Sequence, residues 1–460
     1  MRHLFNKIIL FFLSVGFILF AGMSIAEVPV SPETNSSPAA NDIPSDLDAY
    51  LAITDHAFQW EIVEKTENHN EKSYLLEMTS QVWHEIPWKH YLLIVIPNKL
   101  DNSSHAALYI TGKRIGSKPN ENDKLLARTL AETCGMPLGT LFQVPNQPLL
   151  GNFSEDALIG ETMLKTLETK DTTWSLLFPM VKSALRAMDA IQQVLKQEQQ
   201  FDIKGFIVTG ASKRGWTTWL AAASKDPRII AIAPIVIDNL NIRKQMEYQI
   251  ETWGDFSPSI KDYSDRNLIR KNDNDVSEIK ERLWKMIDPY FYLDRLTLPK
   301  LLVHATNDPY WTVDAAKNYW NDIPGIKYML TLPNAGHGLD NQLPKAIMTI
   351  AVFSRYAANG ENWPKMDWKL NEQDSQYTVT VKTEIPNYRI KIWSAASDTK
   401  DFRQSKWTSK SLDNNNSNNN NLSDTIVVAK PTTGHLAFYV ELESKHDGLP
   451  FSLTTQVWRF

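Results

Sequence analysis

The 460-residue chain has a single cysteine and little net charge, and each of these absences excludes a class of protein. Because Cys134 has no second cysteine to pair with, no intrachain disulfide forms, and a small disulfide-stapled scaffold is excluded. A formal net charge of −5 leaves no basic excess, so we expect no nucleic-acid partner. The sequence also lacks an HExxH motif and clustered Cys/His spacing, so we predict no metal and no cofactor.

Long apolar runs are also scarce, and the one near the start of the chain predicts an export signal. Arg2 and Lys7 supply positive charge, residues 8–20 are mostly apolar, and a small-residue Ser-Ile-Ala site ends at Ala26. We predict a signal peptide over residues 1–26, and hence a periplasmic or secreted protein with no membrane span after cleavage. An uncleaved N-terminal anchor is the alternative.

The most informative segment is FIVTGASKRGW at residues 206–216, where an apolar run leads into Gly-x-Ser and then into a helix-compatible sequence. A nucleophile elbow has this pattern, because a strand that turns sharply into a helix holds the serine hydroxyl above the sheet. The usual signature is Gly-x-Ser-x-Gly, but here Gly215 comes three residues after Ser212. An ordinary turn between strand and helix is therefore an open alternative.

Two further apolar runs end in polar turns that complete a catalytic set. Residues 300–311, KLLVHATNDPYW, end beyond Asp308, and residues 327–338, KYMLTLPNAGHG, end beyond His337. The chain order Ser, Asp, His is that of the α/β-hydrolase triad. We therefore predict Ser212 as nucleophile, His337 as general base and Asp308 as the acid that orients it.

Other residues compete for these roles. Asp238 ends the strand after the nucleophile strand and is an alternative acid, since the acid loop is not fixed among such enzymes. Asp314 is a weaker candidate, because a carboxylate at the start of a helix is favoured by the helix dipole. His304 lies within an apolar strand, which indicates a core residue rather than a base.

Strands alternate with helical patterns over residues 47–365, which predicts an α/β domain with a mainly parallel sheet and helices on both faces. Residues 27–46 read as a flexible lead. Residues 239–298 form an insertion that is either a cap over the site or an ordinary crossover. Short alternating strands in residues 366–460 predict a small C-terminal β-sandwich, interrupted by an Asn-rich loop at residues 413–421.

Several longer motifs resemble a known family. They are SQVW at residues 80–83 with PWKHYLLIVIP, GASKRGWTTWLAA from Gly210, PIVIDNLN from Pro234, HATNDPYW from His304 and PNAGHG from Pro333. From about Leu47 to the C-terminus the chain resembles the PhoPQ-activated pathogenicity-related proteins. The resemblance implies an exported α/β-hydrolase-like protein tied in bacteria to virulence and antimicrobial-peptide resistance. It also implies that the late glycine is a family trait, similar to elbows in certain carbohydrate esterases.

The elbow suggests which groups would surround a substrate. The backbone N–H of Lys213 and an N–H at Gly112 or Lys113 are the predicted oxyanion hole. Lys213 and Arg214 could bind an anionic group, or could pair with neighbouring acids instead. The predicted substrate contacts are Arg214, Trp216 and Trp311.

Two functions follow from the sequence. The first is a serine hydrolase that cleaves an ester or amide in a small-molecule, peptide or envelope substrate. The second is a non-catalytic binding or signalling protein that keeps the hydrolase fold.

Overall fold

The structure is a computed structural model that describes residues 43–460 except for 69–70, 272–276, 362 and 413–421. The predicted signal peptide, most of the predicted lead and the Asn-rich loop lie outside the described residues. Within the described ranges, no helix has both the length and the apolar content needed to cross a membrane.

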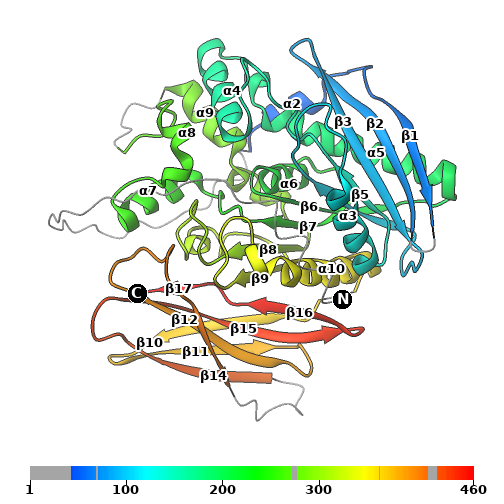
Figure 1. Cartoon of the computed structure of the whole chain (residues 1–460). Coiled ribbons are helices and arrows are strands. Elements are labelled where there is room, and N and C mark those ends of the chain that lie inside the picture. The colour runs from blue at the N-terminus through cyan, green and yellow to red at the C-terminus, as the bar shows by residue number, and fades with distance from the viewer. Residues whose placement is uncertain (1–42, 69–70, 272–276, 362, 413–421) are drawn as a thin grey trace.

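In the described part of the chain, nine strands form one large sheet (Figure 1). The first three strands pair antiparallel, and β4 to β9 run parallel to one another along the rest of the sheet, with β5 joining the two parts. The spatial order is β1 (Gln59–Glu67), β2 (Glu71–Trp83), β3 (Ile86–Pro97), β5 (Leu138–Leu141), β4 (His105–Ile110), β6 (Gly205–Ala211), β7 (Ile229–Ile235), β8 (Lys300–Ala305) and β9 (Lys327–Leu332).

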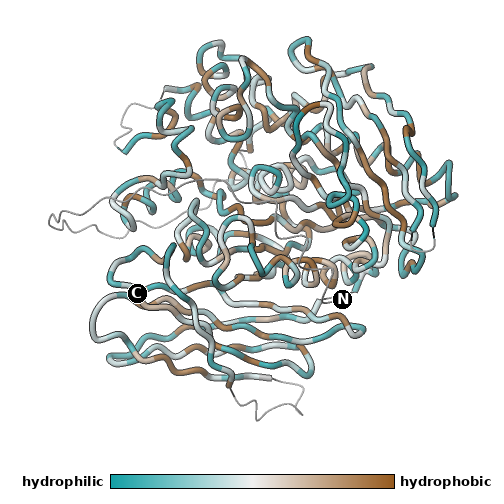
Figure 2. Tube along the Cα trace, viewed as in Figure 1, coloured by the Kyte–Doolittle hydropathy of each residue, from teal (hydrophilic) through white to brown (hydrophobic). Residues whose placement is uncertain are grey.

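Helices cover both faces of this sheet (Figure 1). One face carries α5 (Leu177–Gln199) and α6 (Lys213–Ala223), and the other carries α3 (Glu121–Cys134) and α10 (Leu343–Asn359). Figure 2 shows hydrophobic residues along the central strands and α10, as expected for strands buried on both faces. Among the described residues, the other α-helices are α2 (Asp46–Leu51), α4 (Glu155–Thr169), α7 (Ile242–Trp253), α8 (Lys261–Ser264) and α9 (Glu278–Ile287).

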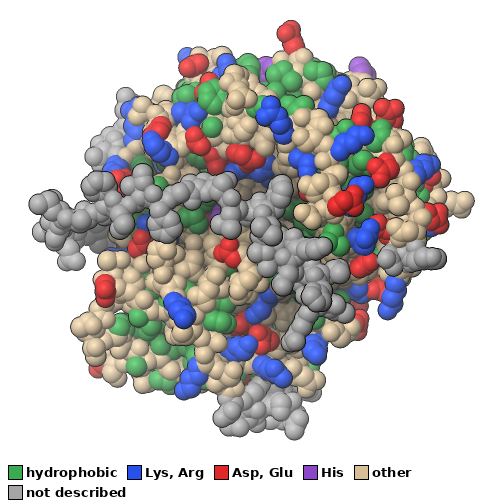
Figure 3. Space-filling model, viewed as in Figure 1, with side chains coloured by type: hydrophobic (Ala, Val, Ile, Leu, Met, Phe, Trp, Pro, Cys, Tyr) green, Lys and Arg blue, Asp and Glu red, His purple; other side chains and the backbone are tan. Residues whose placement is uncertain are grey.

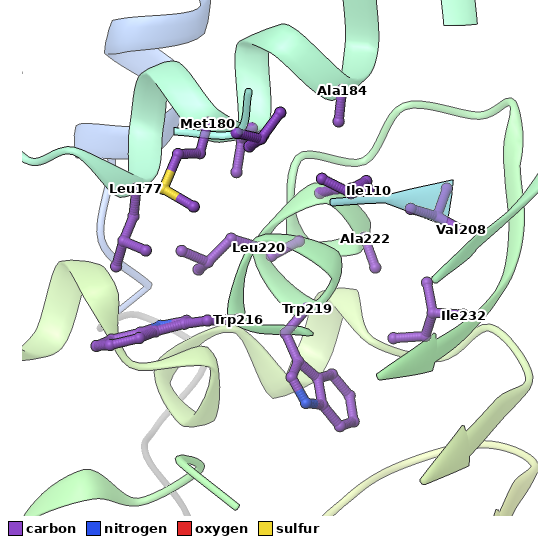
Figure 4. Close-up of a cluster of buried hydrophobic side chains, with 14 of the residues drawn as sticks. Ile110, Leu177, Met180, Ala184, Val208, Trp216, Trp219, Leu220, Ala222 and Ile232 are labelled. Carbon is purple, nitrogen blue, oxygen red and sulfur yellow. The ribbon is translucent and has the colours of Figure 1, made fainter. Parts of the chain in front are cut away.

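The helix that follows the elbow is packed in the core. Figure 4 shows Leu220 of α6 beside Leu177 and Met180 of α5, with Trp219 on the side of α6 that faces away from α5. Leu220 and Trp219 are fully buried, and burying a side chain the size of leucine stabilises the fold by roughly 1.5–3 kcal/mol. The position of α6, and with it the turn at Ser212, is therefore fixed by the core.

The C-terminal strands form two antiparallel sheets below α10 (Figure 1). Their facing sides share one hydrophobic cluster with α10, in which the rings of Tyr377 and Phe438 lie 5.7 Å apart. The first sheet holds β10 (Met366–Glu372), β11 (Gln376–Thr383) and β14 (Leu422–Ala429). The second holds β13 (Thr408–Leu412), β12 (Arg389–Ser397), β15 (His435–His446), β16 (Leu449–Thr454) and β17 (Trp458–Arg459).

Charged side chains of both signs are interspersed on the face shown in Figure 3.

Two elements have other bounds than the apolar pattern of the sequence predicts. The pattern predicts a helix from residue 171, but α5 begins at Leu177, because the Asp171 side chain caps a separate 3-10 turn, Thr172–Trp174. The run at residues 451–458 is two strands, because the Val440 N–H donates to the side-chain hydroxyl of Thr455 and not to a backbone carbonyl, which ends the pairing of β16 with β15.

Candidate active site

Ser212 occupies the sharp turn between β6 and α6, with φ of 57° and ψ of −123°. A non-glycine residue in this region stores strain of about 1–3 kcal/mol, which persists only where the surrounding structure enforces it. The two glycines explain how the turn fits. A Cβ on Gly210 would lie 2.7 Å from the Arg214 carbonyl oxygen, and one on Gly215 would lie 2.6 Å from Ile237. The late glycine therefore lets α6 pack against the end of β7, because the same Cβ would also lie 3.1 Å from the Ile235 carbonyl oxygen.

The three predicted triad residues meet at the carboxyl ends of β6, β8 and β9. Nε2 of His337 lies 2.8 Å from Oγ of Ser212, and Nδ1 lies 2.8 Å from Oδ2 of Asp308. Asp308 is buried, with 5% of the residue exposed, whereas His337 and Ser212 are half-buried. This geometry lets the histidine accept a proton from the serine while the carboxylate fixes its tautomer.

The competing acids contact other groups. Asp238 accepts a hydrogen bond from the Tyr319 hydroxyl, and its Oδ2 lies 2.9 Å from Nδ1 of His304. Asp314 binds Arg459, near the C-terminus. The structure therefore brings Asp308, and neither Asp238 nor Asp314, to the ring of His337.

Tyr310 supports the acid and the base together, and sequence reasoning missed it. Its backbone N–H donates to Oδ1 of Asp308 at 2.9 Å, and its ring lies 4.3 Å from the His337 ring. Its hydroxyl donates to Asp156 at 3.2 Å. Burial and the charge of Asp156 raise the pKa of Tyr310 well above its usual range, so it stays a neutral donor.

Asp156, at the start of α4, gathers polar groups beside the triad. It accepts hydrogen bonds from Lys213 Nζ at 2.9 Å and from the Tyr263 hydroxyl at 2.9 Å, in addition to Tyr310. Burial and Asp156 raise the pKa of Tyr263, which keeps its hydroxyl protonated. The Lys213 ammonium is therefore paired with an acid of the protein. The sequence left this pairing open as the alternative to binding an anionic group of the substrate.

Arg214 is held in the same way. Its guanidinium donates two hydrogen bonds to Glu155, at 2.7 and 2.8 Å, and one to the Val144 carbonyl. It also packs against Gly112, where a Cβ would lie only 2.2 Å from Nη2. Arg214 thus packs against the loop that is predicted to supply part of the oxyanion hole. Because its guanidinium is bound to Glu155, its position does not support the predicted contact with substrate. The side chain of Lys113 is bound elsewhere, since its Nζ forms an ion pair with Asp123.

The ion pair between Glu155 and Arg214 predicts an acid-dependent loss of stability. Burial alone would raise the pKa of Glu155, but the charge and hydrogen bonds of Arg214 lower it to about 2, below the ordinary 4.5. A carboxyl with a depressed native pKa stabilises the fold fully above the unfolded value and loses this contribution as pH falls through the native value. We expect the difference in Tm between the protein and Glu155→Gln to shrink as pH falls from about 4.5 to about 2, measured by circular dichroism. A difference that stays constant over this window would contradict the assignment.

A mostly apolar pocket opens beside Ser212 and His337. Trp216 and Trp311 line it, as the sequence predicts, whereas Trp219 lies in the core (Figure 4). Asn239, which follows β7, also lines it and was not predicted. The insertion predicted as a cap or crossover supplies much of the wall: Ile242, Met246, Ile260, Tyr263, Ile269 and Trp284.

The C-terminal sheets contact both catalytic loops. Asn307, beside Asp308, donates to the backbone carbonyls of Arg403 and Ser405 at 3.1 and 2.8 Å. Asn334, three residues before His337, exchanges two hydrogen bonds with the backbone of Trp407, at 2.9 and 2.7 Å. The segment before β13 thus fixes the acid loop and the base loop at once.

Over the described ranges, no three His, Cys, Asp or Glu side chains gather in a metal-binding arrangement. The strand order, with its antiparallel start and parallel remainder, the strained serine turn after β6 and the Ser-His-Asp contacts together define an α/β-hydrolase fold. The chain belongs to the PhoPQ-activated pathogenicity-related proteins, since the sequence model of that family matches residues 47–403.

Individual proteins are also similar to this chain. Autocrine proliferation repressor protein A of Dictyostelium discoideum is 28% identical over 432 residues, which cover 86% of this chain and 85% of that protein. Acetyl xylan esterase 1 from Thermoanaerobacterium sp. JW/SL YS485 is 15% identical, covers 68% of this chain and 95% of its own, and has a TM-score of 0.49. The glucuronoyl esterase from Solibacter usitatus is 11% identical, covers 68% and 91%, and has a TM-score of 0.41.

Proposed function

We propose that this protein is a serine hydrolase that cleaves an acyl ester or amide through an acyl-enzyme. The observation that carries the proposal is the unbroken contact from Asp308 through His337 to Ser212, with both distances at 2.8 Å. Contacts of this length are those of an activated nucleophile.

The reaction uses the triad in two halves. Oγ of Ser212 attacks the acyl carbonyl carbon while Nε2 of His337 takes its proton, and Asp308 stabilises the imidazolium. The intermediate then expels the alcohol or amine, which receives that proton from His337. Water, deprotonated by His337, attacks the acyl-enzyme, and the released Ser212 oxygen regains a proton.

The oxyanion is stabilised by backbone donors. Lys213 is the first residue of α6, so its N–H has no partner within the helix and the helix dipole favours negative charge there. The second donor comes from Gly112 or Lys113, whose loop is held by Arg214. One such donor is worth about 3 kcal/mol in the transition state.

A panel of p-nitrophenyl acyl esters tests the proposal. We expect hydrolysis above the background of a Ser212→Ala sample purified in parallel, with a preference for apolar acyl groups that the pocket can bury. Equal rates in the two samples would reject the proposal.

The Asn334 contact predicts a positioning effect. Asn334→Ala removes both hydrogen bonds to Trp407 and places alanine at φ of 54°, which disfavours it. We expect kcat for the best ester to fall by up to about 10²-fold with little change in KM, because His337 loses its alignment. Asn334→Asp keeps the acceptor for the Trp407 N–H and should restore part of kcat. A loss of Tm with kcat per folded molecule unchanged would show a purely structural role.

A second candidate is a non-catalytic signalling or binding protein. The similar Dictyostelium discoideum protein is named an autocrine proliferation repressor, which favours this alternative. It predicts that Ser212→Ala keeps any cellular effect of the protein, whereas the hydrolase proposal predicts its loss.

Export to the periplasm or medium is a further proposal, supported by the N-terminal sequence. Its test is the N-terminus of the mature protein, which we expect at Glu27.

A further inference from the structure

Asn239 has a buried side-chain amide that is not hydrogen-bonded to the described protein. The residue is 1% exposed, and neither Nδ2 nor Oδ1 has a hydrogen-bond partner among the residues that the structure describes. It lines the same pocket as Ser212 and His337. Buried side-chain amides are nearly always paired, because an unpaired one loses its hydration without compensation.

Trp311 repeats this pattern in the same pocket. Its Nε1 is also buried without a partner in the described part of the chain. The other indole near the nucleophile is different, since Nε1 of Trp216 donates to the Ile287 carbonyl at 2.6 Å. Asp156, Tyr263 and Tyr310 likewise satisfy one another. Two residues that line the pocket therefore carry unpaired polar groups: one acceptor, Oδ1 of Asn239, and two donor groups, Nδ2 of Asn239 and Nε1 of Trp311.

From these groups we infer that the acyl part of the substrate carries a peptide-type amide, as in an N-acylated amino acid or a peptide with an apolar side chain. Oδ1 of Asn239 can accept from the N–H of the residue whose carbonyl is attacked, and Nδ2 of Asn239 or Nε1 of Trp311 can donate to the carbonyl of the preceding residue or acetyl group. The inference rests on the proposed hydrolase function.

The walls of the pocket suit the side chain of such a substrate. Ile237, Ile242 and Met246 line the same pocket, and they offer apolar contact without further hydrogen bonds. A plain fatty acyl chain would fill the same volume but leave Asn239 and Trp311 unpaired. A site that is built to hydrogen-bond a substrate rejects an analogue that lacks the group far more strongly than one that differs by a methylene.

The test compares two p-nitrophenyl esters, that of N-acetyl-leucine and its analogue with CH2 in place of the amide N–H. Each kcat/KM is divided by the hydroxide rate of the same ester. We expect the amide ester to be preferred by at least about 10²-fold in the unaltered protein. A normalised ratio near one overturns the inference, because it means that the substrate N–H makes no hydrogen bond that stabilises the transition state. This result does not depend on any variant folding.

Two variants locate the preference. Asn239→Leu is close in shape and has no polar atom, so it should bring the ratio down to near one by lowering kcat/KM for the amide ester. Trp311→Phe should lower kcat/KM of both esters by about 10-fold and leave their ratio nearly unchanged, because both esters keep the carbonyl to which Trp311 would donate. A ratio unchanged in Asn239→Leu would also overturn the inference. Failure of the proposed function looks different, since neither ester would then be hydrolysed above the Ser212→Ala background.

Discussion

Replacing Ser212 with alanine is expected to lower kcat/KM for the best ester by about 10⁴- to 10⁶-fold. The reason is that Oγ forms the bond to the acyl group, and no other hydroxyl lies within hydrogen-bond distance of His337 Nε2 in the described residues. His337→Ala should cost about as much, and the double variant no more than either single one, because the two residues act as a unit. The measurement is steady-state hydrolysis, with folding checked by circular dichroism.

The chain offers a matched control in a second serine–histidine pair. Oγ of Ser80 lies 3.0 Å from Nε2 of His90, but Ser80 is fully buried, and burial lowers the pKa of His90 to about 4. Nδ1 of His90 contacts the Phe142 carbonyl rather than a carboxylate. Ser80→Ala should therefore leave kcat of the folded protein close to its original value. If Ser212→Ala kept more than a tenth of the activity, the assignment of the nucleophile would be wrong.

Asp308→Asn is expected to lower kcat by about 10⁴-fold while the fold persists. An amide at this position keeps the shape, but it favours the wrong tautomer of His337 and cannot stabilise the imidazolium. Raising the pH should restore little of the lost kcat, because the amide favours the wrong tautomer of the histidine at every pH. Steady-state kinetics of the ester between neutral and alkaline pH measures it.

Asp238→Asn is the comparison that decides between the two acids left open by the sequence. Asp238 contacts Tyr319 and His304, so its amide variant should lose stability but keep kcat per folded molecule within a few-fold. If Asp238→Asn lost activity as severely as Asp308→Asn does, the acid would be shared or misassigned.

The sheet and the triad could be predicted because they depend on local signals. Apolar runs that end in polar turns mark the ends of parallel strands, and those ends meet at one edge of the sheet, so Ser212, Asp308 and His337 come together. The displaced Gly215 looked like a defect in the motif. Its reason is tertiary, since only the packing of α6 against Ile237 shows why a side chain cannot fit there.

The surroundings of the triad were harder to predict for the same reason. The charges of Lys213 and Arg214 suggested an anion site, but Glu155 and Asp156, some sixty residues earlier in the chain, take up both. Asn239 gave no signal, because the sequence does not reveal that a buried amide lacks a partner. The support that Asn307 and Asn334 receive from the segment before β13 likewise depends on how the C-terminal sheets pack.

The most direct test of the central claim is labelling with a fluorophosphonate probe followed by mass spectrometry of the digested protein. The probe forms a covalent adduct with a serine only where a base activates that serine. We predict one adduct, on Ser212, that is absent in His337→Ala and unaffected by Ser80→Ala. No adduct on the folded protein, or an adduct on Ser212 that persists in His337→Ala, would contradict the account.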